Sequence, residues 1–439
     1  MAYKGWSRAE IYFKDLRIGG DFRLLNPNTD DIFMVRAMND AFYVMTNYEA
    51  PKYRIFKGHY DKPELEFWEE VVPEGESVME TFGVVGGNII VAGLRNASSN
   101  LRIYSPGKEE PGTIALPAIG SVMADPERGF GTEPEGEEFL FGFSSFTVPP
   151  RIYRYDMKGG MLSVLDSIET DLDFSQFQIE QVWFPSKDST PVSMFLVHKK
   201  GLNRDGNNPA VVYGYGGFNA VMTPYFSRTL THFLDRGGVY AYTQIRGGGE
   251  YGEEWHRGGM LENKQNSFDD FIAACEWLIE NNYTNPNRLA IEGGSNGGLL
   301  VGAVMVQRPD LMKAVVCSRP LLDMLRYHKF LIGELWVPEY GSADNPEQFE
   351  YLYAYSPYHH VVPNTAYPAV LFASADHDSR VDPLHARKMT AAVQAATSSD
   401  NPILYRFQRK TGHGQGAPRS IVIEEVIDEW SFVFRQLGM

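Results

Sequence analysis

The stretch RLAIEGGSNGGLLVGAVMV, Arg288–Val306, places four glycines around Ser295 between two apolar runs. The first run predicts a buried strand, and the second can continue as a helix. Within it, Gly293-Gly-Ser295-Asn-Gly297 matches G-x-S-x-G, a sharp strand-to-helix turn that exposes a serine hydroxyl above a sheet. Glycines suit such a turn because Cβ atoms would clash where it closes on its neighbours. The stretch predicts an α/β domain with Ser295 as a candidate nucleophile.

Two phosphate-binding alternatives for the same glycines do not fit. A Walker loop ends in Gly-Lys-Ser/Thr, and residues 291–300 contain no lysine. The dinucleotide fingerprint G-x-G-x-x-G has a different spacing. G-x-S-x-G alone is a modest signal, however, because Ser295 could also lie in a flexible turn.

Residues 174–439 alternate apolar runs with helical patterns, which indicates a mostly parallel sheet covered on both faces. Strands are expected at 194–197, 210–213, 239–242, 288–291, 314–316, 369–372 and 403–407. Apolar positions in 267–279 have helical spacing. Ser267 is expected as the N-cap of this helix, with Asp270 in its first turn.

Residues 1–173 contain strand-like runs without a long helical pattern. Three similar segments begin at Phe42, Ile89 and Phe139, which are 47 and 50 residues apart, and each ends in an Arg-Ile-Tyr/Phe strand. Ala9–Leu16 resembles the tail of a further unit. A period of this length with several strands favours the blades of a β-propeller. The alternative is an irregular sandwich of hairpins.

Composition narrows the class of protein. The chain has 439 residues, 43% of them hydrophobic, 13% aromatic and 22% charged, which is typical of a globular protein of two domains. A net charge of −16 argues against a nucleic-acid partner, since phosphate binding needs excess Lys and Arg. Cys275 and Cys317 lie in apolar stretches and are expected in the core of a protein from a reducing compartment.

Targeting signals are not expected. The first residues, MAYKGWSRAE, lack the apolar run of a signal peptide. No apolar stretch approaches the roughly 18 residues needed to span a bilayer. The two matches to the glycosylation pattern, at Asn96 and Asn282, are interpreted as chance. We therefore expect a cytoplasmic protein with no membrane partner.

A serine nucleophile needs a base and an orienting carboxylate, which in α/β-hydrolases follow in the order Ser, Asp, His. Asp376-His377-Asp378 follows one predicted strand, and His413 follows the next, between two glycines. Both loops are at predicted strand ends, where the sites of open α/β sheets form. The order and the position favour His413 over a merely solvated loop histidine.

Six motifs in the chain strongly resemble the prolyl oligopeptidase family of serine peptidases. The motifs are YGYGGFN (213–219), IRGGGEYGEEWH (245–256), NKQNSFDDF (263–271), GGSNGGLL (293–300), ADHDSRV (375–381) and GHGQG (412–416), and the similarity covers essentially all of 174–439. The resemblance implies a β-propeller domain, 1–173, before an α/β-hydrolase catalytic domain, 174–439. It also implies a serine-type endopeptidase that cleaves short peptides after proline, with no metal or cofactor.

The resemblance also implies roles for individual residues. Ser295 would be the nucleophile, His413 the general base and acid, and Asp378 the orienting carboxylate, leaving Asp376 and His377 as structural residues. The oxyanion donors would be the backbone N–H of Asn296 and the Tyr215 hydroxyl. Trp336 would pack on the proline ring, Arg380 would bind a substrate carbonyl, and the pocket walls would include Phe218, Tyr340, Val381 and Leu321.

Several features depart from the family pattern. Arg319 stands where a small or apolar residue is expected. Glu334 and Glu339 flank the pocket segment and leave open an oligopeptidase B-like preference for a basic P1 residue, or a broader one.

The length of the chain is a further departure. The family is longer and has a seven-bladed propeller, whereas this chain holds about three blades and part of a fourth. The non-enzyme alternative is a truncated product that is inactive or serves only in interactions. A second enzyme class, a carboxylesterase, would share the triad, but Trp336 and Arg380 in peptidase motifs disfavour it. A folded chain is expected to be a monomer.

Overall fold

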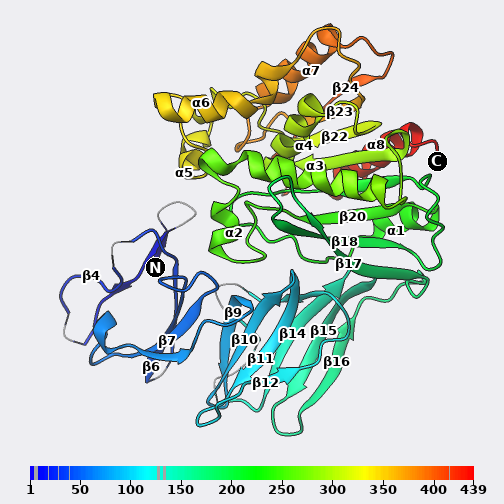
Figure 1. Cartoon of the computed structure of the whole chain (residues 1–439). Coiled ribbons are helices and arrows are strands. Elements are labelled where there is room, and N and C mark those ends of the chain that lie inside the picture. The colour runs from blue at the N-terminus through cyan, green and yellow to red at the C-terminus, as the bar shows by residue number, and fades with distance from the viewer. Residues whose placement is uncertain are drawn as a thin grey trace. The chain divides into compact units, whose positions relative to one another are not determined.

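The computed structural model describes the whole chain except residues 4–7, 18, 28, 39, 126–128, 132–134 and 415. The chain divides into two compact units (Figure 1). The first unit consists of Met1–Phe174, Thr223–Phe226 and Gly249–Glu254. The second consists of Ser175–Met222, Ser227–Gly248 and Trp255–Met439.

The first unit contains three successive four-stranded antiparallel sheets, the arrangement of propeller blades. Their strands are β5 (Phe33–Ala37), β6 (Ala41–Thr46), β7 (Arg54–His59) and β8 (Glu69–Val72); β9 (Val78–Val85), β10 (Asn88–Arg95), β11 (Ser98–Tyr104) and β12 (Gly112–Ile114); β13 (Ser121–Met123), β14 (Glu138–Ser145), β15 (Val148–Asp156) and β16 (Met161–Ser167). Two short pairs precede them: β1 (Ala2–Tyr3) with β2 (Ala9–Glu10), and β3 (Tyr12–Phe13) with β4 (Arg23–Leu24).

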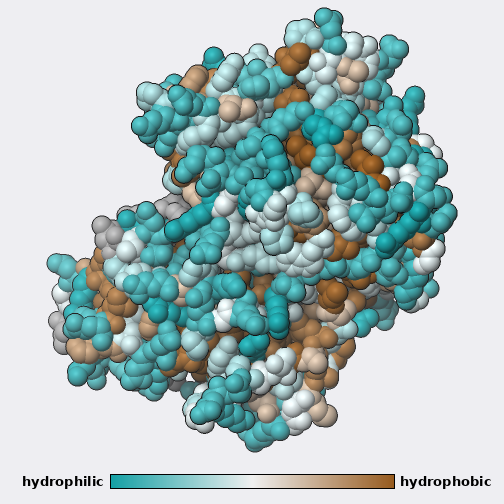
Figure 2. All heavy atoms as spheres, in the orientation of Figure 1, coloured by the Kyte–Doolittle hydropathy of each residue, from teal (hydrophilic) through white to brown (hydrophobic). Residues whose placement is uncertain are grey.

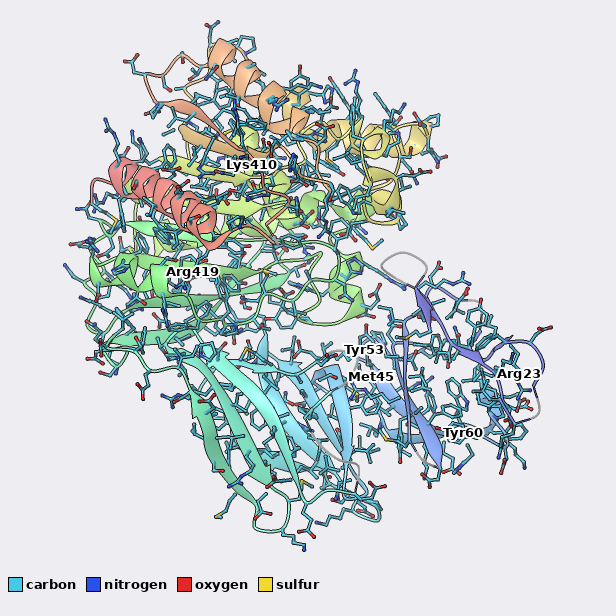
Figure 3. All side chains as sticks on the ribbon, turned by 180° about the vertical axis from the view of Figure 1, so that it is seen from behind. Arg23, Met45, Tyr53, Tyr60, Lys410 and Arg419 are labelled. Carbon is cyan, nitrogen blue, oxygen red and sulfur yellow. The ribbon has the colours of Figure 1, made fainter. Side chains whose placement is uncertain are left out.

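The repeat seen in the sequence corresponds to the middle of each sheet. Phe42, Ile89 and Phe139 lie in β6, β10 and β14, and each of these strands pairs with the next along the chain. Aromatic side chains hold the unit together locally. Tyr60, labelled in Figure 3, packs against Phe42 with ring centroids 5.9 Å apart. The periodicity therefore reflects a repeated pair of central strands.

The second unit is built on an eight-stranded sheet in the order β17-β18-β20-β19-β21-β22-β23-β24. The strands from β20 to β24 in this order are parallel, while β17 and β18 pair antiparallel. The edge strand β17 is absent from the strands expected from sequence. The strands are β17 (Phe177–Pro185), β18 (Pro191–Lys199), β19 (Ala210–Tyr213), β20 (Val239–Gln244), β21 (Leu289–Gly294), β22 (Ala314–Ser318), β23 (Ala369–Ala375) and β24 (Ile403–Gln408).

Helices cover both faces of this sheet. Adjacent strand residues point to opposite faces: the Cys317 thiol donates to Gly298 O of α4, whereas the Ser318 hydroxyl donates to Glu429 of α8. Helix α1 lies on the α8 face, because Phe233 packs on Trp430. The helices are α1 (Arg228–Asp235), α2 (Glu253–Arg257), α3 (Gln265–Glu280), α4 (Asn296–Gln307), α5 (Val337–Tyr340), α6 (Pro346–Tyr355), α7 (Leu384–Ala396) and α8 (Arg419–Gln436) (Figure 1).

The expected N-cap at Ser267 is wrong. Helix α3 begins at Gln265, so Ser267 lies inside the helix, and its hydroxyl donates to Arg246 O at 2.7 Å. Asp270 is fully buried and accepts hydrogen bonds from the Arg246 guanidinium, with Nε 3.0 Å from Oδ2. The ion pair with Arg246, rather than the helix dipole, therefore explains why a carboxylate is found at position 270.

On the face drawn in Figure 2, hydrophilic residues cover most of the area and hydrophobic residues form several smaller patches. Cys275 and Cys317 are both free thiols buried in the core of the second unit. Within the part of the chain that the structure describes, no helix combines the length and the apolar character that a bilayer crossing requires.

Candidate active site

Ser295 lies between β21 and α4 in a strained backbone conformation, with φ 58° and ψ −118°. Its N–H donates to Ser318 O of the adjacent strand at 2.9 Å, and its carbonyl accepts from Leu299 N in the first turn of α4. A Cβ on Gly293 would lie 2.2 Å from Gly297 O, which no side chain can accept. The turn is therefore the tight elbow that the glycine pattern predicts, and such strain is typical of functional sites.

Asp378 and His413 form a hydrogen-bonded pair. His413 Nδ1 lies 2.7 Å from Asp378 Oδ2, while Asp378 Oδ1 accepts from the N–H groups of Arg380 and Val381 at 2.9 Å each. Burial raises the pKa of Asp378, but the bond with His413 and the two N–H groups outweigh it, and the net pKa lies below the usual value. The carboxylate is thus ionised and aimed at the imidazole.

Asp376 and His377 brace the segment that carries His413. Asp376 Oδ1 accepts from Lys410 N at 2.6 Å, and His377 N donates to Thr411 O at 3.0 Å. Figure 3 labels Lys410 and Arg419, which mark the two ends of this segment between β24 and α8. These contacts are structural, and among the described residues the imidazole pairs with Asp378 and not with Asp376.

The Tyr215 side chain is buried, and Ser295 and Arg380 both influence its pKa. Burial raises the pKa of Tyr215, and its hydrogen bond with Ser295 and the positive charge of Arg380 act in the opposite direction. Tyr215 thus remains protonated and can donate. Among the described residues, His413 is hydrogen-bonded to Asp378 and not to Ser295. The structure thus forms the pair of His413 with Asp378, and Tyr215 is influenced by Ser295.

The side chain of Asn296 links two further parts of the site. Its Nδ2 donates to Tyr215 O at 2.5 Å, and its Oδ1 accepts from the Tyr340 hydroxyl at 2.8 Å. Asn296 is 1% exposed. The sequence gives this residue only a backbone role, whereas the structure shows that its amide also holds the strand end that carries Tyr215.

Aromatic rings gather where the sequence predicts the pocket. Phe218 meets Trp336 edge-on with centroids 6.3 Å apart, and it meets Tyr340 in the same way at 5.3 Å. Leu321 and Val381 are buried in the same apolar cluster. The side chain of Arg380 is exposed. The rings form an apolar wall of the kind that a pyrrolidine ring can pack against.

Glu339 has a structural role that the sequence did not reveal. It is 3% exposed. One carboxylate oxygen accepts from Phe218 N at 2.8 Å, and the other lies 2.8 Å from His256 Nε2. Because both carboxylate oxygens already have hydrogen-bond partners, Glu339 is not free to bind a basic substrate side chain. Glu339 therefore does not support a preference for a basic P1 residue. Glu334 is exposed.

Lys264 is a third buried polar residue beside the 215–218 segment, after Asn296 and Glu339, and is 1% exposed. Its ammonium donates to Gly216 O at 2.6 Å and lies 5.6 Å from the centroid of the Tyr340 ring. Burial lowers the pKa of Lys264 to about 8, against the raising effect of Glu339. Lys264, Glu339 and Asn296 together hold the backbone of 215–218, which is the segment that links Tyr215 to Phe218.

This network predicts that Glu339→Gln destabilises the protein. A Gln amide would direct a donor at one of the two N–H groups and would remove the charge beside buried Lys264. We expect a loss of about 3 kcal/mol in the free energy of unfolding, measured by urea denaturation at pH 7. The matched control is Glu334→Gln, an exposed residue of the same segment, which should change stability by less than about 0.5 kcal/mol. Equal midpoints for the two variants would contradict the role given to Glu339.

Comparisons with protein families give a separate match for each half of the chain. Residues 224–439 match the prolyl oligopeptidase family, and residues 1–167 match the prolyl oligopeptidase N-terminal β-propeller domain. The predicted fold class, a propeller domain before an α/β-hydrolase domain, is thereby confirmed. The described residues contain no group of three or more His, Cys, Asp or Glu side chains arranged to hold a metal ion.

Individual relatives are similar over nearly the whole chain. A prolyl endopeptidase of Elizabethkingia meningoseptica is 38% identical over 98% of this chain and 60% of its own length. A prolyl oligopeptidase of Omphalotus olearius is 38% identical over 90% of this chain and 54% of its own length. The chain thus spans less than two thirds of these curated relatives.

Solved structures of prolyl endopeptidases and prolyl oligopeptidases are similar to this chain as well. One from a study of two prolyl endopeptidases superposes with a TM-score of 0.94 at 44% identity, covering 99% of this chain and 63% of that one. Prolyl oligopeptidase B from Galerina marginata, bound to a 35mer hydrolysis and macrocyclization substrate, superposes with a TM-score of 0.91 at 31% identity, covering 99% and 62%.

Proposed function

The chain belongs to the prolyl oligopeptidase family, and on that premise we propose that it is a serine endopeptidase that hydrolyses short peptides on the carboxyl side of proline. The single observation that carries this proposal is the pairing of Asp378 with His413 at 2.7 Å in a unit that also holds Ser295 in a strained elbow. Both features are what covalent acyl transfer by a serine requires.

In the proposed reaction, the Ser295 hydroxyl attacks the carbonyl carbon of the proline residue. His413 takes the serine proton and then delivers it to the leaving amine, which frees the first product and leaves an acyl-enzyme. A water molecule activated by His413 hydrolyses this ester. Asp378 holds the imidazole in the tautomer with the proton on Nδ1 and stabilises the imidazolium. No metal ion or cofactor takes part in these steps.

The tetrahedral intermediate carries a negative oxygen, which two donors would stabilise. One is the backbone N–H of Asn296 at the start of α4. The other is the Tyr215 hydroxyl, whose contact with Ser295 supports this assignment. A preorganised donor of this kind contributes roughly 3–4 kcal/mol to lowering the barrier.

The preference for proline would come from the aromatic wall. Trp336 would pack on the pyrrolidine ring, with Phe218 and Tyr340 at right angles beside it. Leu321 and Val381 would complete the apolar surface, and Arg380 would donate to a substrate carbonyl. The commitment of Glu339 to Phe218 and His256 favours proline over a basic residue.

The test is an assay of the purified 439-residue chain on fluorogenic peptides with Pro, Arg or Ala at P1, beside Ser295→Ala. Turnover of the Pro peptide that is lost in the variant supports the proposal. Preference for the Arg peptide would assign the chain to the basic branch of the family instead. A folded chain that turns over none of the three peptides would overturn the peptidase proposal.

The proposal extends to partners and location. The partners are short proline-containing peptides, and the protein acts as a monomer in the cytoplasm. Two free, buried cysteines suit a reducing compartment. A net charge of −16 disfavours self-association and an anionic nucleic-acid partner. Sedimentation of the purified chain tests the monomer.

A further inference from the structure

Arg319 lies directly after β22 and departs from the small or apolar residue that the sequence motif leads one to expect. Its backbone has φ 47°, a conformation that is uncommon for residues other than glycine. Its N–H donates to Ala373 O of β23 at 2.7 Å. Its side chain is only 13% exposed. A strained, largely buried arginine at the end of a central strand needs an explanation in its contacts.

The guanidinium of Arg319 joins two segments that are about a hundred residues away along the chain. Its Nε donates to Gly412 O at 3.3 Å, and Gly412 directly precedes His413. Its Nη2 forms an ion pair with Glu425 of α8 at 2.8 Å, and the Glu425 side chain is 14% exposed. The rigid fork of an arginine can serve both acceptors at once, which an ammonium group cannot do with the same geometry.

These contacts connect the predicted base to the predicted nucleophile. The residue before Arg319, Ser318, accepts the N–H of Ser295 through its carbonyl. Among the described residues, Asp376, His377 and Asp378, which all follow β23, also contact the His413 segment. The bond from Arg319 ties this segment in addition to β22, the strand against which the Ser295 turn rests.

We propose that Arg319 is a positioning residue that holds the backbone of Gly412, and thereby the His413 imidazole, at the correct distance from Ser295. Glu425 keeps the guanidinium in place. The inference rests on the proposed function, since it assumes that His413 transfers the proton of Ser295. Arg319 acts through His413 and makes no contact with substrate.

The experiment compares Arg319→Ala with a matched control. Arg406 of β24 forms an ion pair with Asp428 of α8 at 2.7 Å, and the Arg406 side chain is also 13% exposed. Arg406→Ala therefore removes a similar link between the sheet and α8 without touching the His413 segment. We expect Arg319→Ala to lower kcat roughly 10- to 100-fold, because small displacements of reacting groups cost that much. KM should stay within about 2-fold. Arg406→Ala should keep both constants, since its partner Asp428 is 57% exposed and the pair lies outside the His413 segment.

Two further measurements separate positioning from general stability. The rate of covalent labelling of Ser295 by a fluorophosphonate should fall in proportion to kcat in Arg319→Ala and remain unchanged in Arg406→Ala. Arg319→Lys keeps a cation beside Glu425 and should fold even if the alanine variant does not. Its kcat should lie between those of the unmodified chain and Arg319→Ala.

Each outcome decides the inference. Full activity in Arg319→Lys and Arg319→Ala, or an equal loss in Arg406→Ala, would overturn the positioning role while leaving the proposed function intact. A rise in KM with unchanged kcat would overturn it as well. An unmodified chain that cleaves no peptide would overturn the proposed function, and this inference with it.

Discussion

Ser295→Ala is expected to lower kcat for a Pro-P1 peptide about 10⁶-fold, the scale of loss when a serine nucleophile is removed. The methyl group cannot form the acyl-enzyme, so the variant retains only what transition-state stabilisation and binding provide. The measurement is steady-state hydrolysis of the fluorogenic Pro peptide, with kcat and KM determined separately. KM should change little, because the aromatic wall of Phe218, Trp336 and Tyr340 is untouched.

The control for this variant is Ser379→Ala. Ser379 is an exposed serine beside Asp378, so its loss tests whether any serine substitution near the site has the same effect. We expect kcat within about 2-fold of the unmodified chain, since exposed substitutions change little. Activity of Ser295→Ala above roughly one hundredth of the unmodified chain would exclude Ser295 as the nucleophile in the usual mechanism.

Asp378→Asn is expected to lower kcat about 10⁴-fold, the size of effect known when the carboxylate of such a triad is replaced by its amide. The amide would favour the wrong imidazole tautomer, because it can present an N–H group to Nδ1, where the carboxylate accepts at 2.7 Å. The measurement is the dependence of kcat on pH between roughly pH 5 and 9, a range that includes the reference histidine pKa of about 6.5. Geometry should be preserved, so KM should change far less than kcat.

Asp376→Asn is the matched control for that experiment. Asp376 lies two residues away and accepts from Lys410 N, a bond that an Asn side-chain oxygen can also accept. We therefore expect a loss of no more than about 10-fold, within the range of an altered neutral hydrogen bond. Similar losses in both variants would mean that the assignment of the orienting carboxylate to Asp378 is wrong.

The lowered pKa of Asp378 also predicts a difference in acid stability. A carboxyl whose folded pKa lies below its unfolded value of about 3.9 stabilises the fold above that pH. This contribution is lost as the pH falls through the folded pKa. In acid titration, the unmodified chain should lose this part of its stability below about pH 4, whereas Asp378→Asn should not.

Much of the fold could be predicted from local patterns. The apolar runs at 194–197, 210–213 and 314–316 all lie within strands of the sheet, and the helical spacing in 267–279 lies within α3. Errors occurred where local preference competes with tertiary contacts. Ser267 resembles an N-cap, but its hydroxyl bonds to Arg246 O from inside the helix. The edge strand β17 mixes polar and apolar residues and did not stand out.

The sequence by itself determined the elements and the order of Ser295, Asp378 and His413, because glycine geometry, hydrophobic periodicity and motif order are written in neighbouring residues. Only the tertiary structure decided what Glu339, Lys264 and Arg319 do. Phe218 and Glu339 are 121 residues apart, and Arg319 and Gly412 are 93 apart. Hydrogen bonds over such separations depend on how the strands and loops pack in three dimensions, so the positioning of the site becomes visible only in the folded chain.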